Sequence, residues 1–502
     1  MQKRQQIEYG DFQTPDELSQ QVVTLLKCIG VQPTVILEPT CGFGSFVHAS
    51  IDGFGNGASY YAFDMNSSYL EQLKQRVPSD LLQMTIRRQN FFEHNWKAFF
   101  ANMASENILV IGNPPWVTNS TLGTLGSQNV PVKTNFQGYR GFDAKTGKAN
   151  FDIAEWMLIT LIESLQHNTA CVAMLCKSAT ARKVLQYFWK KGAHVSQSSL
   201  HTIDAKAHFG VSVDACLFIT HIENGTCSTD ATIYSALNFT DNTARFGLSG
   251  KKLIADLDAY QHTKFIDGTA YYTWRSGVKH DASNVMEFTQ HGSGFVNGFG
   301  DVVDLEPDYV FPLLKSSDIA NNRLTPRKFI IITQHHVGED TETLQYDAPK
   351  TWEYLMKHAA ILDRRKSSIY RRRSRFAIFG IGDYSFAPWK VTISGLYKHI
   401  RFSAIGTISE KPIMVDDTCY FIPCFSQEEA VFVTTLLNSD VCQNFLRSLI
   451  FFDAKRPITK DILQRIDLKK LADYYHPEEH TSSYFSQAQV GLTGQTSLVF
   501  ET

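Results

Sequence analysis

Val35-Ile36-Leu37-Glu38-Pro39-Thr40-Cys41-Gly42-Phe43-Gly44-Ser45-Phe46 is the stretch of sequence that decides the fold. It begins with three branched apolar residues, as in a buried strand, and continues with an acidic residue and a Gly-x-Gly turn that leads toward a helix. Glycine lets the backbone approach a ligand closely, and the carboxylate can accept hydrogen bonds from a cationic or amino group. The stretch therefore predicts a ligand site between a strand and a helix.

Short apolar runs like the first one recur along the first half of the chain, at 35–37, 60–63, 108–111, 171–175 and 216–219. Amphipathic segments such as 154–165 separate them. This alternation predicts an α/β fold, a Rossmann-like, doubly wound sheet with helices on both faces, whose ligands lie beyond the carboxyl ends of the strands.

Two polar stretches interrupt this pattern. Residues 119–150 are rich in Gly, Ser, Thr and Asn and predict a long functional loop. Residues 224–250 predict a domain boundary, which divides the chain into domains 1–245 and 246–502. The second domain shows no clean alternation, and we expect mixed α/β structure there.

Bulk composition narrows the class of protein. The 502 residues carry a net charge of -2, with 43% hydrophobic and 20% charged residues, which fits a globular chain of two or three domains. No apolar run reaches the ~18 to 20 residues of a membrane-spanning helix. The N-terminus lacks the apolar core of a signal peptide, so we expect a cytoplasmic protein without membrane association. Nine cysteines without CxxC pairs or Cys/His spacing predict no metal site.

A second motif, Asn113-Pro114-Pro115-Trp116, follows the apolar run 108–111. Its two prolines stiffen the loop and remove two backbone donors, which leaves acceptors, one amide side chain and one large aromatic ring. A flat group that bears an amine would fit there.

Other residues predict a nucleoside ligand. The turn with only two glycines and an acid favours an adenosyl ligand without phosphates over a dinucleotide. Asp64 directly follows the run 60–63, at a strand end where an acid commonly holds ribose hydroxyls.

Upstream of these motifs, Thr14 is the expected N-cap of a helix whose first residue is Pro15.

In this order, the pieces resemble the class I S-adenosylmethionine-dependent methyltransferases. More narrowly, they resemble the DNA N6-adenine methyltransferases of the γ arrangement, including the methylases of type II restriction-modification systems. The Asn-Pro-Pro-aromatic sequence is the specific element. The matching positions lie within about residues 9–220 and are Phe12-Gln13-Thr14-Pro15, Glu38 to Gly44, Asp64, Asn90-Phe91-Phe92 and Asn113 to Trp116.

The resemblance implies S-adenosyl-L-methionine as cofactor and assigns roles to several residues. The methionine end of the cofactor would contact Thr14, Glu38, Pro39, Gly42 and Gly44. Asp64 would hold the ribose, and Phe91 would pack against the adenine ring. Asn90 stands where the family usually has Asp, so its side-chain carbonyl would accept the hydrogen bond from the cofactor's adenine amine.

The resemblance also implies a mechanism. The Asn113 side-chain oxygen and the Pro114 carbonyl would accept the hydrogens of an adenine exocyclic amine, which frees the nitrogen lone pair for direct, in-line methyl transfer. Trp116, which follows Pro115, would stack on the target base after that base is rotated out of the duplex. Phe209 is the expected second wall of this base pocket.

The second half contains a basic run that we call the cationic strip, residues 363–376. Such a local concentration in a chain of net charge -2 predicts a DNA-facing surface, and the resemblance implies that the whole half is a target-recognition domain. Lys279 and Lys390, near tryptophans in the sequence, are further candidates for contact with double-stranded DNA. The seven cations of the strip are Arg364, Arg365, Lys366, Arg371, Arg372, Arg373 and Arg375.

Three functions stay open at this point. The preferred one is a monomeric, nucleoid-associated DNA adenine methyltransferase, the modification component of a restriction-modification system, with a separately encoded restriction endonuclease as partner. The second keeps the chemistry but methylates an RNA base or a protein glutamine. The third, motivated by Asn90, is a DNA-binding protein with a vestigial methyltransferase domain.

Overall fold

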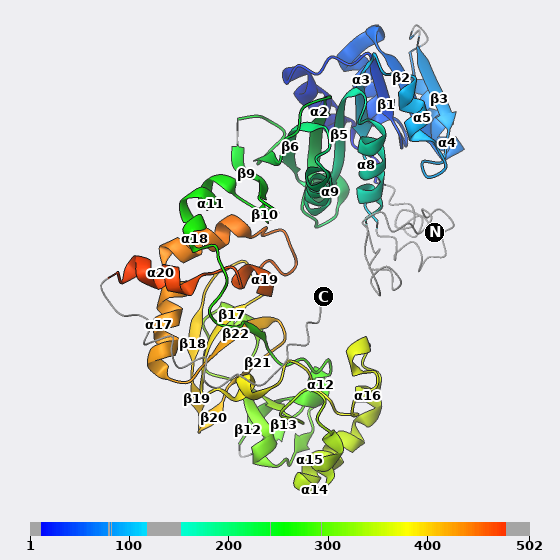
Figure 1. Cartoon of the computed structure of the whole chain (residues 1–502). Helices are drawn as coiled ribbons and strands as arrows, with labels where there is room; N and C mark the ends of the chain where they lie inside the picture. Colours follow the sequence, from blue (N-terminus) through cyan, green and yellow to red (C-terminus); the bar gives the residue numbers. More distant parts are fainter. Residues whose placement is uncertain are drawn as a thin grey trace. The chain divides into compact units, whose positions relative to one another are not determined.

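The computed structural model describes residues 12–78, 81, 83–117, 152–240, 242–292 and 294–477 (Figure 1). The chain divides into two compact units, Met1–Asp258 and Ala259–Thr502. The predicted boundary at 245/246 falls inside strand β9 (Asn242–Ser249), which pairs with β8 (Asp230–Tyr234), so the first unit extends past it. The predicted loop 119–150 lies outside the described residues.

The first unit is built on a ten-stranded sheet in the part of it that the structure describes, in the order β10-β9-β8-β6-β7-β5-β4-β1-β2-β3. Strands β3, β2, β1, β4 and β5 run parallel, and β7 lies antiparallel between β5 and β6. The remaining bounds are β1 (Val35–Glu38), β2 (Ser59–Asp64), β3 (Met84–Arg88), β4 (Asn107–Gly112), β5 (Thr169–Lys177), β6 (Val195–Ile203), β7 (Ala215–Ile222) and β10 (Lys252–Ile254).

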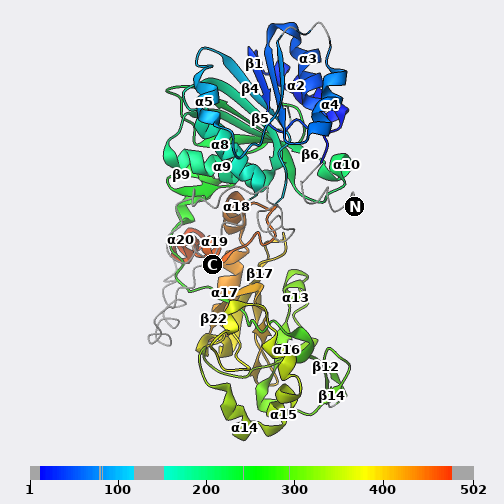
Figure 2. The ribbon, with the colours of Figure 1, turned by 90° about the vertical axis from the view of Figure 1, so that its right-hand side faces the viewer.

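Helices cover both faces of this sheet (Figure 2). On one face α2 packs on α3, and on the other α8 packs on α5 and α9. The crossover helices are divided between the two faces because the chain moves along the sheet in one direction from β1 to β2 and in the opposite direction from β4 to β5. The helices are α2 (Asp16–Cys28), α3 (Ser45–Phe54), α4 (Ser67–Arg76), α5 (Trp96–Ala101), α8 (Ile153–Ser164), α9 (Ser178–Lys191) and α10 (Ala205–Phe209), and α11 (Leu257–Thr263) spans the boundary between the two units.

The Rossmann-like prediction is confirmed. The five apolar runs fall inside β1, β2, β4, β5 and β7, and their side chains are almost all buried because helices cover the sheet on both sides. One local prediction is wrong. Thr14 does not cap α2, because the Pro15 carbonyl accepts the first backbone bond, from Ser19 N (3.1 Å), and Pro15 is itself the N-cap residue.

The second unit is mixed α/β, as expected. Its described strands form a six-stranded sheet, β14-β13-β12-β16-β15-β21, a four-stranded sheet, β11-β22-β17-β18, and a β19-β20 pair. The bounds are β11 (Arg275–Ser276), β12 (Glu287–His291), β13 (Gly294–Val296), β14 (Val302–Val303), β15 (Val310–Leu314), β16 (Lys328–Ile331), β17 (Trp389–Ser394), β18 (Ser403–Ile405), β19 (Thr407–Ile408), β20 (Lys411–Pro412), β21 (Met414–Val415) and β22 (Cys419–Cys424).

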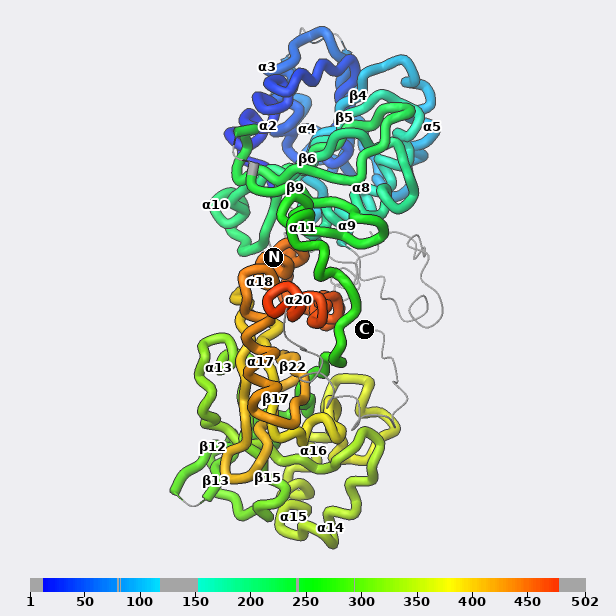
Figure 3. The backbone as a smooth tube through the Cα atoms, turned by 60° about the vertical axis from the view of Figure 1, so that its left-hand side comes forward, coloured from blue at the N-terminus to red at the C-terminus, as the bar shows by residue number. Residues whose placement is uncertain are grey.

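Helices pack around these sheets, and α17 packs on β17 and on α20 (Figure 3). Within the described residues, we find no helix with the length and apolar character of a membrane-spanning segment. The helices of this unit are α12 (Ser283–Met286), α13 (Ser316–Ala320), α14 (Leu344–Asp347), α15 (Pro349–Lys357), α16 (Ala359–Asp363), α17 (Gln427–Leu437), α18 (Asp440–Leu449), α19 (Lys460–Leu463) and α20 (Leu468–Tyr475).

Candidate active site

The glycine turn, residues Pro39–Gly44, connects β1 to α3 at the carboxyl end of the sheet. Gly42 and Gly44 have φ values of +52° and +81°, a backbone conformation that side chains with a Cβ rarely adopt. A Cβ at Gly44 would also lie 2.4 Å from Leu73 Cδ1. The conformation of the turn thus requires glycine at both positions. Without side chains there, the backbone of the turn is open to a ligand.

Two acidic side chains brace this turn. Asp64, at the end of β2, accepts a hydrogen bond from Gly42 N (2.9 Å) through Oδ2. The buried Glu38 accepts one from Val47 N (3.1 Å), in the first turn of α3, through Oε2. Burial raises the pKa of the Glu38 carboxyl well above its ordinary value, against the effect of the Val47 hydrogen bond. A ligand that brings an ammonium group would stabilise the ionised form of this carboxyl.

The Asn-Pro-Pro-Trp loop, Asn113–Trp116, lies beside the glycine turn. Strands β4 and β1 are neighbours, and a Cβ at Gly112 would lie 3.4 Å from Glu38 Cγ. Asn113 donates from Nδ2 to the Phe12 carbonyl oxygen (3.0 Å). Its Oδ1 is buried and has no hydrogen-bond partner among the described residues. The Pro114 carbonyl likewise accepts no hydrogen bond from that part of the chain.

Unpaired buried acceptors are costly, so their presence needs an explanation. A second one lies in the glycine turn, where Thr40 Oγ1 is also buried without a partner in the described structure. Ligand groups that donate hydrogen bonds would satisfy both atoms. The two motifs of the sequence therefore meet at one place and present acceptors for a ligand with amino or hydroxyl groups.

The far end of the Asn-Pro-Pro-Trp loop is fixed by strand β5. Lys177 donates from Nζ to the Trp116 carbonyl (3.1 Å) and to Asp152 Oδ2 (2.6 Å). The Trp116 indole N–H donates to the Leu175 carbonyl (3.3 Å). The loop is thus held at both ends by protein groups and needs little reorganisation to present its acceptors.

Trp116 and Phe209 are brought together, with ring centroids 5.2 Å apart in an edge-to-face arrangement. Phe12 joins them at 6.3 Å from Trp116 and 6.2 Å from Phe209. Trp116 is only 7% exposed. The expectation that Trp116 offers an open stacking face is not met in this structure, because the other two rings and the core pack against it.

Phe91 and Asn90 follow β3, which neighbours β2. Phe91 is buried against Trp96, with centroids 4.8 Å apart. Asn90 Oδ1 accepts a hydrogen bond from Phe92 N (3.0 Å), which closes a turn within the motif. The Asn90 oxygen therefore already has a structural role, although a carbonyl oxygen can accept a second hydrogen bond.

In the cationic strip of the second unit, Arg365 and Arg375 interact with other groups of the protein. Arg365 donates to the carbonyls of Leu362 (2.9 Å), Ala377 (2.8 Å), Arg375 (2.8 Å) and His280 (3.4 Å). Its guanidinium lies 3.8 Å from the ring centroid of Tyr370. Arg375 forms an ion pair with Asp363 (2.5 Å). The donors of Arg365 are thus largely used inside the fold and the charge of Arg375 is balanced, whereas their contact with DNA stays a prediction.

Outside the strip, Lys390 and Lys279 are less available for contact with DNA than the sequence predicts. Lys390 is 2% exposed in β17 and donates to the Ala387 carbonyl (3.0 Å), so it cannot reach a DNA phosphate. Burial lowers the pKa of its amine to about 7. Lys279 pairs with Asp281 (2.5 Å) and Asp417 (3.5 Å), which neutralise its charge. The predicted DNA contact of Lys390 is therefore wrong in this structure, whereas that of Lys279, whose side chain is 32% exposed, stays a prediction.

The other five cations of the strip are exposed. In the described part of the chain none of them forms an ion pair. Arg372 in addition has a φ of +62°, a strained conformation for a residue with a side chain. The five are Arg364, Lys366, Arg371, Arg372 and Arg373.

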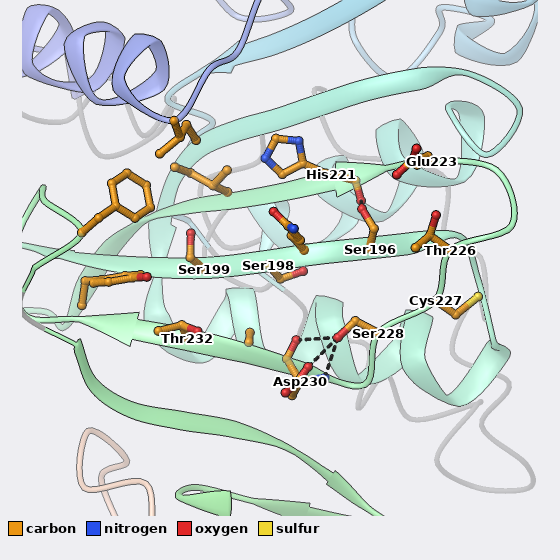
Figure 4. A pocket seen from close by; sticks show the side chains of 16 residues that line it. Ser196, Ser198, Ser199, His221, Glu223, Thr226, Cys227, Ser228, Asp230 and Thr232 are labelled. Atoms are coloured by element: carbon orange, nitrogen blue, oxygen red, sulfur yellow. Dashed lines mark hydrogen bonds between the residues drawn. The ribbon is translucent and has the colours of Figure 1, made fainter.

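A separate hollow of about 570 Å³ lies on the sheet of the first unit (Figure 4). Hydroxyl side chains of β6 and β8 line it, including Ser196, Ser198 and Thr232, together with His221 of β7. No residue of either motif lines this hollow. It is therefore distinct from the site at the carboxyl ends of β1 and β4.

Sequence reasoning missed several residues of the site. Phe12 and Gln13 carry no sequence signal beyond their place in a motif, and the sequence predicts no partners for Lys177. Lys177 ends an apolar run, as Glu38 and Asp64 do, and that signal could have identified it. The contact between Phe12 and Asn113, 101 residues apart, leaves no trace in local sequence.

Comparisons with known proteins agree with this geometry. No family model matches the chain. The chain is 43% identical over 474 residues to the Type II methyltransferase M.NspV of Nostoc sp. (strain ATCC 29411 / PCC 7524), which covers 94% of this chain and 98% of the relative. A solved structure of the Type IIL restriction-modification enzyme MmeI in complex with DNA has a TM-score of 0.56 at 13% identity. That match covers 88% of this chain but only 63% of the MmeI chain, and it shows the fold alone.

Proposed function

Because this chain belongs to the type II DNA methyltransferases of restriction-modification systems, we propose that it methylates adenine at N6, with S-adenosylmethionine as methyl donor. The observation that carries this proposal is the buried Oδ1 of Asn113 next to the Pro114 carbonyl, neither of which has a hydrogen-bond partner among the described residues. Two acceptors side by side complement a group with two N–H donors, such as an exocyclic amine.

The amine of adenine is a poor nucleophile because its lone pair is delocalised into the ring. Asn113 Oδ1 and the Pro114 carbonyl accept its two hydrogens and favour a tetrahedral nitrogen with a localised lone pair. Protein dipoles that are fixed before the reaction stabilise the developing charge without rearrangement. Such positioning requires no covalent bond between the enzyme and the base.

The residues of the glycine turn fit the cofactor. S-adenosylmethionine supplies an electrophilic methyl group on a sulfonium. Glu38 Oε1, which makes no hydrogen bond within the described structure, is available to the amino group of the methionine end. Thr40 Oγ1 is a further unpaired atom for that end, and Gly42 and Gly44 leave the backbone open. Asp64 is suited to the ribose hydroxyls and Phe91, with Asn90, to the adenine ring.

For double-stranded DNA, the five exposed cations of the strip, which form no ion pair with other described residues, support contact with phosphates. Strain at Arg372 supports the same role, since a strained backbone persists most often where function requires it. The target adenine has to leave the helix to reach Asn113, because its amine is otherwise paired in the duplex. Stacking on Trp116 then requires displacement of the Phe12 or Phe209 ring.

Methyl transfer from radiolabelled S-adenosylmethionine tests the proposal, with unmodified duplex DNA, structured RNA and protein compared side by side. Labelled N6-methyladenine from the digested DNA is the expected product. Methylcytosine as the product would refute the adenine assignment. Label only in RNA or in protein glutamine would favour the second function, and absence of cofactor binding in calorimetry would favour a vestigial domain.

A further inference from the structure

The segment Phe12–Thr14, which precedes Pro15 and α2, contacts both motifs of the site. We call this segment the strap. Gln13 Oε1 accepts a hydrogen bond from Phe43 N (3.1 Å), and the Thr14 carbonyl accepts one from Ser45 Oγ (2.7 Å). Both contacts attach the strap to the glycine turn and the start of α3. The neighbouring Phe12 carbonyl accepts from Asn113 Nδ2 (3.0 Å). The strap is therefore a physical link between the glycine turn and the Asn-Pro-Pro-Trp loop.

The Phe12 carbonyl determines which way the Asn113 amide points. A carbonyl can only accept a hydrogen bond, so the NH₂ group of Asn113 has to face Phe12 and Oδ1 has to face away. If this bond were lost, the amide could rotate by half a turn. The rotated amide would present two donors to an amine that needs acceptors. The site would then be inactive without any change in fold.

Gln13, which directly follows Phe12, attaches the strap to the glycine turn through its side chain. Its side chain reaches the backbone of the glycine turn, and a Cβ at Gly42 would lie only 2.5 Å from Gln13 Oε1, which shows how closely the two segments pack. Phe12 is attached to the same three-residue segment. A shift of the strap away from Phe43 would therefore move the Phe12 carbonyl relative to Asn113.

We propose that Gln13 is a positioning residue that couples the glycine turn to the orientation of the Asn113 amide. The inference rests on the proposed function, because it assigns the Asn113 oxygen to the substrate amine. Gln13 acts on the rate of methyl transfer at saturating cofactor and has little effect on cofactor affinity. Because coupling between two sites is reciprocal, a base held by Asn113 also steadies the glycine turn.

The test compares three variants in the full-length protein. Gln13→Met keeps the size of the side chain and removes the acceptor, whereas Gln13→Glu retains an acceptor for Phe43 N. Gln21→Met is the matched control, since Gln21 is exposed on α2 and its side chain donates a hydrogen bond to Glu17 on the same helix. Turnover is measured with labelled S-adenosylmethionine on unmodified DNA. Binding of S-adenosylhomocysteine is measured by calorimetry.

We expect Gln13→Met to lower kcat by roughly five- to tenfold, the effect of one lost hydrogen bond, while the Kd for S-adenosylhomocysteine changes less than about twofold. Gln13→Glu recovers most of the rate, and Gln21→Met matches the unmodified chain. If Gln13→Met does not fold, Gln13→Asn serves in its place, because its shorter side chain leaves Phe43 N without a partner.

Two results would overturn the inference. One is a Gln13→Met enzyme with unchanged kcat, and the other is a variant whose only defect is weaker cofactor binding that excess cofactor restores. Failure of the proposed function looks different, because the unmodified chain would then place no label on adenine in DNA.

Discussion

The Asn-Pro-Pro-Trp loop and the cationic strip differ in where their partners lie. The loop is held by groups that are far away in the sequence, the Phe12 carbonyl on one side and Leu175 and Lys177 on the other. The strip is held mainly by groups close to it in the sequence, since Arg375 pairs with Asp363 and Arg365 binds the carbonyls of Leu362 and Ala377.

This difference shows how each region can work. In the loop, three hydrogen bonds to distant groups leave one defined pair of acceptors, so a single substitution should remove the activity. In the strip, two cations build the local structure and five remain exposed, so the effect on DNA binding should be distributed over several residues. Identical side chains in the strip should therefore give unlike phenotypes, and the predictions below test this division.

The largest effect is expected from Asn113→Ala. Loss of a fixed acceptor for the substrate amine should lower kcat by about 10³-fold, about 4 kcal/mol of transition-state stabilisation. Cofactor affinity should stay within about threefold, because the glycine turn is untouched. Calorimetry and label transfer measure the two quantities. Asn102→Ala, an exposed position on the same unit, is the control, and substantial turnover by Asn113→Ala would remove Asn113 from the mechanism.

Arg365→Ala should be the most destabilising change in the strip. It leaves several carbonyls without their donor and removes the contact with Tyr370, so we expect a loss of about 3 kcal/mol in the free energy of unfolding. Arg364→Ala, at an exposed neighbour, should stay within about 0.5 kcal/mol. Urea unfolding measures both. Equal stability of the two variants would show that the strip is not divided into structural and exposed cations.

Lys390→Met tests the reassignment of a predicted DNA contact to the core. Burial lowers the pKa of Lys390 to about 7, below the ordinary value of a lysine. Above pH 7 the unfolded chain therefore binds more protons at this residue than the folded chain, so the stability of the native protein should rise with pH. Between about pH 7.5 and 9 we expect a gain of roughly 2 kcal/mol that Lys390→Met lacks.

Unfolding of both proteins across this pH range measures the difference, and DNA binding provides the second readout. Replacement of a buried amine should leave the affinity for DNA unchanged. A loss of DNA affinity in Lys390→Met without a loss of stability would restore Lys390 to the DNA-binding surface.

The sequence predicted the fold and the main motifs because each depends on local features. Branched apolar runs specify buried strands, and glycines at positive φ specify the turn, whatever the rest of the chain does. The meeting of Glu38, Asp64 and Asn113 also followed, since ligands of a parallel sheet gather where strands end.

Burial of individual side chains could not be predicted in the same way. Lys390 lies in β17, which is paired with β18 and β22 on its two sides. Trp116 packs against Phe12, which is distant from it in the sequence. Both outcomes depend on pairing between distant segments. Counting charges in the strip likewise could not separate Arg365 from Arg364, which are adjacent in sequence but differ in exposure.

The smallest effect, and the one that separates function from stability, is expected from Arg372→Gly. Glycine adopts the φ of +62° without strain, so the substitution should raise the free energy of unfolding by about 0.5 to 1 kcal/mol. It also removes one exposed cation. If Arg372 contacts a phosphate, DNA affinity should fall and the slope of log K against log salt should decrease by about 0.9.

Arg372→Ala is the matched control, because it removes the same charge but keeps the strain, and it should lose DNA affinity without any gain in stability. A glycine variant that is more stable and binds DNA as before would mean that the strained turn serves something other than the display of Arg372. A more stable variant with weaker, less salt-dependent binding is the result expected if stability was given up at this turn for contact with DNA.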